Sequence, residues 1–189
     1  FIFAIGLIAY AFWFFLVLLV PRNQLVVFPK TRNLVQVILV FTIIQLIFGA
    51  LMAGHKAATA APTWPDINGT FLPDRLFSTR PWLINFIENK ITIHFIHRNL
   101  AYLLFILTMI LTVQLYKVKN TGRIFNNFKA IPFLLILLQV ILGVSSLVFS
   151  PEIQPNRWGA FEWMAQLHQV TGMLFALSMV ALLYLVRRR

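Results

Sequence analysis

The sequence predicts an all-α membrane protein: a four-helix transmembrane bundle made of two repeated hairpins, plus one preceding transmembrane helix. Three observations lead to this prediction. Of 189 residues, 60% are hydrophobic and only 11% are charged, a composition outside the range of soluble globular proteins. The apolar residues fall into five long runs. All charged residues except Arg98 lie outside these runs, and the five acids share no segment with ten of the sixteen basic residues.

Each apolar run is long enough for a transmembrane helix, because a hydrocarbon core about 30 Å thick requires roughly 20 apolar residues. The predicted spans cover residues 1–20, 34–54, 92–116, 131–149 and 164–186. The first run begins at Phe1 without an initiator Met, a basic leader or a small-residue cleavage site, so we do not interpret it as a signal peptide. We expect residues 1–33 to be the last transmembrane helix of a missing N-terminal half and a cytoplasmic linker. Residues 34–189 are then a C-terminal four-helix bundle.

The net charge of +11 indicates an orientation in the membrane rather than nucleic-acid binding. Ten of the sixteen basic residues follow the first, third and fifth spans: Arg22, Lys30, Arg32, Lys117, Lys119, Arg123, Lys129, Arg187, Arg188 and Arg189. All five acids lie in the other segments: Asp66, Asp74, Glu88, Glu152 and Glu162. By the positive-inside rule, loops 55–91 and 151–163 face outward and the C-terminus is cytoplasmic. We expect a multi-pass protein of the bacterial plasma (inner) membrane, surrounded by lipid. The interleaved basic and aromatic face of a nucleic-acid binder is absent from the sequence.

An internal repeat relates the second span to the fourth and the third span to the fifth. The segment "QLIFGAL" (45–51) matches "QVILGVS" (139–145), with Gln and Gly four residues apart in both. The segment "HRNLAYLLFIL" (97–107) matches "HQVTGMLFALS" (168–178). Leu-rich helices also align by chance, but Gln, Gly and His recur here in the same order. The sequence therefore predicts two hairpins of one type, joined by the basic loop 117–130; such repeats usually pack about a pseudo-twofold axis.

His97 and His168 occupy corresponding places in the repeat, about five and four residues into spans that both run inward. At 1.5 Å per residue, each lies roughly 6–8 Å below its helix start. Two imidazoles at equal depth across a bundle have the geometry of the two axial ligands of a haem iron. The alternative is that carbonyls or loop water satisfy both rings. A zinc or copper site would need further ligands, and only Glu162 is near His168.

Three further polar side chains lie near the predicted outer ends of the spans. Arg98 is either the partner of a haem propionate, because guanidinium pairs with carboxylate in a bidentate manner, or it extends to the outer interface. His94, three residues before His97, lies on nearly the same helix face. It is either a group beside the ligand or substrate, or an interfacial histidine, which we favour. His55, beside Lys56, is interpreted as interfacial.

Small residues and one loop complete the candidate site. Gly49 and Gly143 allow helices or a flat macrocycle to approach closely, and tight helix packing explains them equally well. The loop "APTWPDING" (61–69) contains turn-forming residues and Trp64 as an interface anchor. We expect this loop to be ordered and to cover the mouth of the bundle. The chain has no cysteine, which excludes disulfides, thiolate metal sites, iron–sulfur clusters and covalently attached haem within it.

These segments together resemble the haem A synthase family, over about residues 34–186. Four motifs carry the resemblance in order: "GALMAG" (49–54), "TWPDING" (63–69), "NFIENKITIHFIHRNLAY" (85–102) and a last helix near "QLHQ" (166–169). The match is to the C-terminal half of that family. Its order and spacing make the resemblance specific.

The resemblance implies eight helices in two similar halves, each with a pair of histidines. It implies that His97 and His168 ligate a haem b, and that the protein oxidises the C8 methyl of haem O to give haem A for cytochrome oxidase. Haem O synthase and oxidase assembly proteins are the implied partners. The substrate haem O and an essential glutamate belong to the N-terminal half, so the catalytic residues are unknown here. His94 stands where that glutamate stands in the other half, and Glu88 does not match it. Some members carry a cysteine pair in an outer loop, which this chain lacks.

Three functions therefore follow from the sequence. The leading prediction is the haem b domain of a membrane oxidoreductase, a haem A synthase. The alternative is a bis-histidine b-type cytochrome membrane subunit, which transfers electrons and does no chemistry itself. A small transporter built on a repeat is a third reading. A transporter of this kind would require carboxylates inside the membrane or broken helices, and the sequence shows neither.

Overall fold

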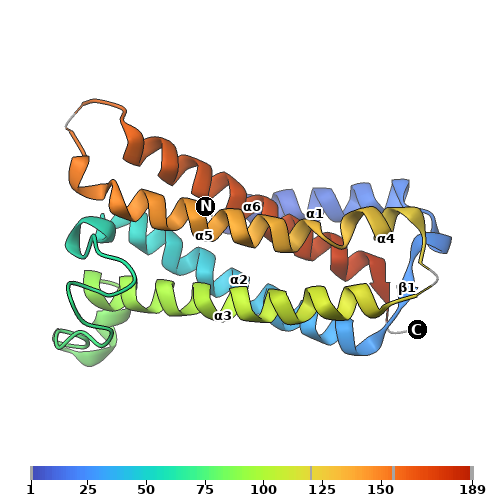
Figure 1. The fold of residues 1–189 in the computed structure, drawn as a ribbon, viewed down its shortest axis with the longest axis horizontal. Coiled ribbons are helices and arrows are strands. Elements are labelled where there is room, and N and C mark those ends of the chain that lie inside the picture. Colours follow the sequence, from blue (N-terminus) through green and yellow to red (C-terminus); the bar gives the residue numbers. More distant parts are fainter. Residues whose placement is uncertain (1, 120, 155, 188–189) are drawn as a thin grey trace. The chain divides into compact units, whose positions relative to one another are not determined.

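The computed structural model describes residues 2–119, 121–154 and 156–187, and it is mostly helical (Figure 1). Its α-helices are α1 (Ile2–Leu19), α2 (Pro29–Gly54), α3 (Lys90–Lys117), α4 (Arg123–Phe128), α5 (Ile131–Val148) and α6 (Ala160–Leu185). Short 3₁₀ helices are η1 (Arg22–Gln24), η2 (Ala57–Ala60), η3 (Trp82–Phe86) and η4 (Ser150–Glu152). Two short strands, β1 (Val26–Val27) and β2 (Val186–Arg187), pair in parallel.

Among the described residues, four helical segments are long and apolar enough to cross a membrane. They are Pro29–Gly54, Lys90–Lys117, Arg123–Val148 (α4 with α5) and Ala160–Leu185. This confirms the predicted all-α, multi-pass membrane protein. The first helix has a shorter described apolar stretch, Phe3–Leu19, so the fifth span stays a prediction. Arg188 and Arg189, part of the predicted charge pattern, lie outside the described residues.

The helices begin before the apolar runs do, because polar residues can form the first turns at the membrane surface. Pro29 opens α2, where its missing N–H costs no hydrogen bond. Before α3, the Asn89 Oδ1 atom accepts hydrogen bonds from the N–H groups of Ile91 and Thr92, which is the usual arrangement of an N-terminal cap. The helix starts therefore lie further from the histidines than the hydropathy pattern suggested.

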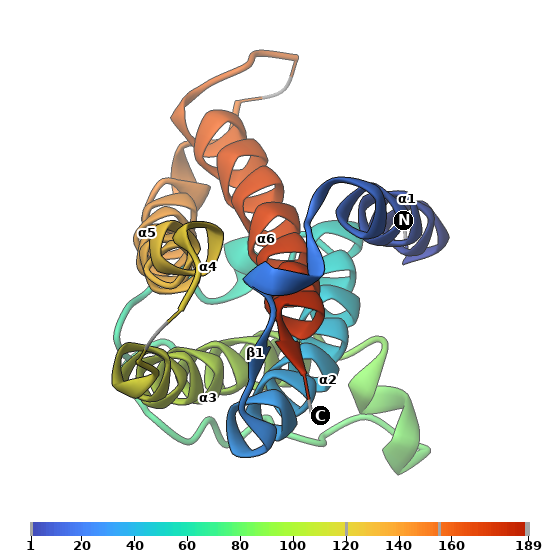
Figure 2. The same ribbon diagram turned by 90° about the vertical axis from the view of Figure 1, so that its right-hand side faces the viewer.

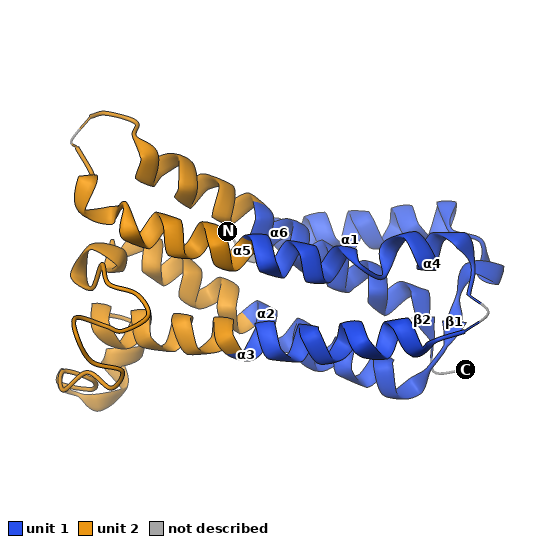
Figure 3. Cartoon of the chain, viewed as in Figure 1, with its two compact units in different colours: residues 1–43, 103–138, 171–189 blue, residues 44–102, 139–170 orange. Residues whose placement is uncertain are grey.

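The chain divides into two compact units, shown in Figure 3. Unit 1 comprises residues 1–43, 103–138 and 171–189; unit 2 comprises residues 44–102 and 139–170. Each of α2, α3, α5 and α6 contributes one end to each unit.

Unit 1 has the apolar core, with fully buried side chains on α2, α3 and α6 such as Val35, Ile38, Leu111, Leu115 and Met179. The β1–β2 pair ties the segment after α1 to the end of α6; Figure 2 shows β1 beside this end. The Arg32 guanidinium donates to the carbonyl oxygens of Leu183 and Val186, which the end of α6 leaves without helical partners.

Unit 2 contains the two long connections, and polar side chains hold them in place. Asn85, fully buried, accepts from the Thr79 N–H and donates to the carbonyls of Thr79 and Trp82. The Ser150 hydroxyl donates to the Ala58 carbonyl and so joins η4 to η2. These bonds satisfy backbone groups that irregular segments would otherwise leave unpaired.

Candidate functional site

His97 of α3 and His168 of α6 face each other within unit 2. Their ring centroids are 6.3 Å apart and the ring planes are inclined at 70°. His97 is seven residues after the first residue of α3, and His168 is eight after the first residue of α6 (97 − 90 and 168 − 160). The structure therefore brings together the two residues that the sequence predicted as a pair, at nearly equal depths in their helices.

Each histidine contacts the preceding long helix of its own hairpin through a glutamine. The Gln45 Nε2 atom on α2 lies 3.4 Å from the His97 Nε2 atom. The Gln139 Nε2 atom on α5 lies 3.2 Å from the His168 Nε2 atom. Both copies of the sequence repeat thus contain the same contact, between a Gln on the first helix of the hairpin and a His on the second.

A glycine one turn beyond each glutamine lets the imidazole lie directly against the helix backbone. A Cβ atom added to Gly49 would lie 3.4 Å from the His97 Cε1 atom. A Cβ atom added to Gly143 would lie only 2.9 Å from the His168 Cε1 atom, closer than side chains tolerate. The sequence left open whether these glycines serve close packing or a ligand. The structure shows that they make room for the histidine rings.

The backbone also sets the tautomer of His168. Its Nδ1 atom lies 3.0 Å from the Gln139 carbonyl oxygen, which can only accept a hydrogen bond, so Nδ1 carries the proton. The Nε2 atom then carries the lone pair and accepts a hydrogen bond from the Gln139 Nε2 atom at 3.2 Å. A metal at this nitrogen would take the place of that hydrogen bond. Three buried atoms beside the pair have no hydrogen-bond partner among the described residues: His97 Nδ1, Gln45 Oε1 and Gln139 Oε1.

The spacing of the rings fits one metal atom held between them. Metal-to-nitrogen bonds of about 2 Å and about 1 Å from each nitrogen to its ring centre place the centroids roughly 6 Å apart, against the observed 6.3 Å. No group of three or more His, Cys, Asp or Glu side chains among the described residues could hold a free metal ion. The pair therefore suits a metal that brings its remaining ligands with it, as iron does in a porphyrin.

Arg98, predicted as a cofactor-binding residue, is buried and bound to the outer loop. Its Nη2 atom donates to the Thr63 carbonyl at 2.9 Å and contacts the His94 Nε2 atom at 2.9 Å. Its Nη1 atom donates to the carbonyls of Pro65, at 3.2 Å, and Asp66. Four terminal N–H groups are thus engaged, and the Nε–H is not among them. A bidentate propionate contact needs two donors, so it would require one of these four to be released. The propionate role stays a prediction.

His94 is buried within the protein, and its predicted place at the membrane interface stays a prediction. Only 3% of its surface is exposed. Because the Arg98 guanidinium can only donate, the His94 Nε2 atom accepts and its Nδ1 atom carries the proton. That Nδ1 atom is buried and has no partner among the described residues. His55, the other candidate, is partly exposed at the end of α2, and Glu88 is exposed before α3.

The loop of residues 61–69 is ordered, as predicted, through bonds within itself. The Thr63 hydroxyl donates to the Asp66 carbonyl and accepts from the Asn68 N–H. The Asp66 Oδ1 atom accepts from the Gly69 N–H, and Gly69 takes a left-handed conformation with φ of 90°. The Thr63 side chain and the Gly69 N–H lower the pKa of the Asp66 carboxyl below its usual value, and the Arg98 charge acts in the same direction.

Sequence reasoning missed the roles of Gln45, Gln139 and the loop carbonyls. The two glutamines appeared only as markers of the repeat, although their recurrence four residues before a glycine was the signal. The carbonyls of Thr63, Pro65 and Asp66 had no signal, because every residue has a carbonyl and only the fold decides which ones meet Arg98.

Comparison with known proteins identifies related sequences. The family model COX15-CtaA, described as cytochrome oxidase assembly protein, matches residues 1–180. A protein named Heme A synthase from Wolbachia pipientis wMel is 35% identical over 165 residues, which are 87% of this chain and 42% of that protein. One of the same name from Bartonella quintana (strain Toulouse) is 38% identical over 129 residues, 68% of this chain and 34% of that protein. The chain spans less than half the length of these relatives. No solved structure gives a significant match.

Proposed function

The chain belongs to the COX15-CtaA family of cytochrome oxidase assembly proteins, and from this premise we propose that its histidine pair binds a haem b within a haem A synthase. The enzyme would oxidise the C8 methyl group of haem O to the formyl group of haem A. The relatives named Heme A synthase support this proposal. The observation that carries it is the pairing of His97 and His168 at 6.3 Å, with each ring against a Gln–Gly segment.

The residues of this chain would bind and orient the haem. His97 and His168 would hold the haem iron through their imidazole nitrogens. The Gln139 carbonyl fixes the His168 tautomer in which the Nε2 atom carries the lone pair. Gly49 and Gly143 set how near each imidazole comes to its neighbouring helix. A bound haem b would supply one-electron transfer, at a potential set by its two imidazoles and its burial.

We place the oxidation of haem O outside these residues. In the membrane-spanning helices the only carboxylate is Glu162, in the first turn of α6, where its Oε2 atom accepts from the Gly159 N–H at 2.8 Å. The other four acids lie before α3 or in η4. Among the described residues, no Asp or Glu joins the histidine pair in a group that could hold a metal ion, and we assign no catalytic residue within this chain.

A second function uses the same site. A bis-histidine b-type cytochrome subunit would need two ligands and no catalytic acid, which is what the described residues of unit 2 offer around His97 and His168. In that case electrons would pass through the haem to a partner, and haem O would not be changed.

The test is the absorption and paramagnetic resonance spectrum of the full-length parent protein. His97→Ala and His168→Ala should each abolish the six-coordinate low-spin signal of this haem, because one axial nitrogen is lost. His55→Ala is the control, since His55 lies outside the pair and should leave the spectrum unchanged. A low-spin signal that survives in both single variants would refute the assignment. The cytochrome would be favoured by two results together: the signal is lost in both variants, and the unmodified parent does not convert haem O.

A further inference from the structure

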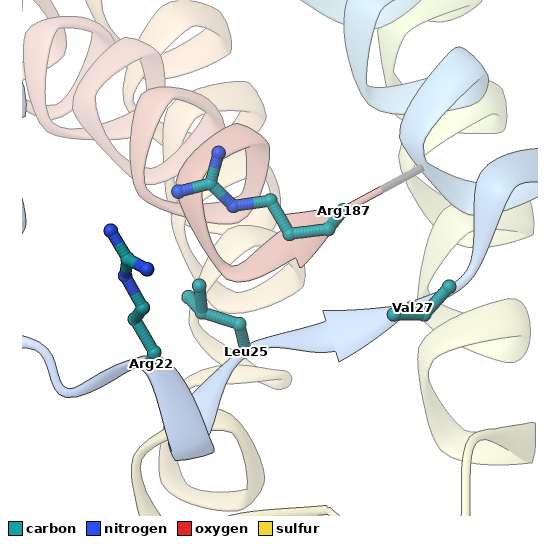
Figure 4. A pocket seen from close by; sticks show the side chains of 4 residues that line it. All are labelled: Arg22, Leu25, Val27 and Arg187. Carbon is teal, nitrogen blue, oxygen red and sulfur yellow. The ribbon is translucent and has the colours of Figure 1, made fainter. Parts of the chain in front are cut away.

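An open pocket of about 390 Å³ lies in unit 1, lined by Arg22, Leu25, Val27 and Arg187 (Figure 4). Arg22 begins η1, Leu25 lies just before β1, Val27 lies in β1, and Arg187 lies in β2. Figure 4 shows the guanidinium groups of Arg22 and Arg187 extending to the same side, with the Leu25 side chain between them. Two arginines from distant parts of the sequence thus line the same pocket as the apolar side chains of Leu25 and Val27.

The backbone around the pocket is held by hydrogen bonds within unit 1. The parallel pairing places Val27 beside Arg187, and the Phe28 N–H donates to the Arg187 carbonyl at 3.1 Å. The Arg187 guanidinium lies 5.0 Å from the centre of the Tyr184 ring. The Tyr184 hydroxyl donates to the Val20 carbonyl, just before η1. The two arginines are therefore brought together by the fold and not by chance proximity of flexible ends.

Nothing in unit 1 can neutralise this charge. All five acids of the chain lie in unit 2, so the segments of unit 1 contain no Asp or Glu. Arg32 differs from the pocket arginines, because its guanidinium donates to two carbonyls at the end of α6. For Arg22 and Arg187, no Asp or Glu of the described residues of unit 1 is available as a counter-ion.

Two guanidinium groups match the oxygens of a phosphate group, which they bind through paired N–H donors. The apolar lining by Leu25 and Val27 suits hydrocarbon beside that phosphate. The pocket also lies where apolar helices end, next to the last residues of α1 and α6 and the first of α2. This is the level of the phospholipid headgroups, and basic pockets between transmembrane helices bind anionic headgroups.

We propose that this pocket binds the phosphate group of an anionic phospholipid, with the guanidinium groups of Arg22 and Arg187 on the phosphate and an acyl chain against Leu25 and Val27. The lipid would hold η1 and β1 against the end of α6 and supply the missing negative charge. The site is separate from the histidine pair, so it does not depend on the function proposed above.

The experiment is lipid titration of the detergent-purified protein, with bound lipid counted by native mass spectrometry. Phosphatidylglycerol, phosphatidylcholine and inorganic phosphate are the three probes. We expect one phosphatidylglycerol to be retained, and the double variant Arg22→Gln/Arg187→Gln to bind it at least about tenfold more weakly. The matched control is Lys117→Gln/Lys119→Gln, which removes two exposed positive charges of unit 1 outside the pocket. It should stay within about twofold of the unmodified protein.

Three results would overturn the proposal. Equal retention of phosphatidylcholine would mean that the headgroup charge is not recognised. Equal weakening in the arginine and lysine variants would mean that only net charge matters. Displacement of phosphatidylglycerol by inorganic phosphate, at comparable affinity, would assign the pocket to a free anion instead of a lipid. Circular dichroism and thermal unfolding, recorded on each variant, check that the fold is intact.

Discussion

Gly143 leaves His168 less room than Gly49 leaves His97. The distances from an added Cβ atom to the Cε1 atoms are 2.9 Å and 3.4 Å. The first is a clash with the ring of a predicted ligand, whereas the second requires only a small adjustment. The two halves of the repeat are therefore alike in pattern but differ in how tightly each histidine is held.

We predict that Gly143→Ala weakens haem binding by roughly tenfold or more, because overpacking costs about 1–3 kcal/mol. Alanine favours a helix over glycine by about 1 kcal/mol, so a destabilised α5 would not explain the loss. Haem content per protein and the low-spin signal measure the effect.

Two matched variants accompany Gly143→Ala. Gly49→Ala should have a smaller effect than Gly143→Ala, and Gly6→Ala should have none, since nothing lies within 4 Å of its added Cβ atom. Equal haem content in all three variants would show that the glycines do not position the histidines.

At the scale of elements, Arg98 joins the loop of residues 61–69 to α3. One buried side chain reaches three loop carbonyls and the His94 ring. Hydrogen bonds with a charged partner contribute about 1.5–3 kcal/mol each, and a buried carbonyl left without a donor is costly. The loop is therefore held by a residue outside it as well as by the bonds within it.

We predict that Arg98→Ala opens the loop, with protease cleavage or hydrogen exchange in residues 61–69 rising at least about tenfold. Arg98→Lys should give an intermediate result, because an ammonium group keeps the charge but lacks the planar set of donors. Arg80→Ala, which removes an exposed arginine from the same connection, is the control. Unchanged exchange in Arg98→Ala would mean that the bonds within the loop suffice.

At the scale of the whole molecule, charge is divided between the two units. Unit 2 holds all five acids, and unit 1 holds ten of the sixteen basic residues and no acid. Since basic segments stay on the cytoplasmic side of a membrane, this division predicts an orientation.

We predict that a single cysteine at Thr121→Cys resists an impermeant thiol reagent added to intact cells and reacts after the cells are opened. The chain has no native cysteine, so the labelled site is unambiguous. Leu72→Cys, at an exposed position in the predicted outer loop, should react in intact cells. Labelling at position 121 in intact cells would refute the orientation.

A second prediction at this scale concerns activity. Expressed from Phe1 onward with haem O supplied, these residues should bind haem b and leave haem O unconverted, because no described Asp or Glu joins the histidine pair in a metal-binding group. The full-length parent should convert it. Pigment extraction and chromatography measure both products. Haem A made by the shorter chain would place the catalytic groups within these residues.

The sequence by itself determined the class of protein, the four long membrane helices and the pairing of His97 with His168. These follow from the length of apolar runs, the placement of charge and the order of Gln, Gly and His, all of which are properties of nearby residues in the chain. The starts of α2, α3 and α6 were less accurate, because polar residues extend these helices beyond the apolar run, as Asn89 does by capping α3.

Only the tertiary structure decided what Arg98, His94 and the two glutamines contact. Arg98 was expected at a propionate or at the interface, yet its partners are carbonyls 32 to 35 residues earlier in the chain. Likewise, Arg22 and Arg187 meet only because β1 and β2 pair across nearly the whole sequence. Backbone carbonyls occur at every residue, and a two-residue strand has no distinctive sequence. Packing alone therefore decides which carbonyls a side chain contacts and which strands pair.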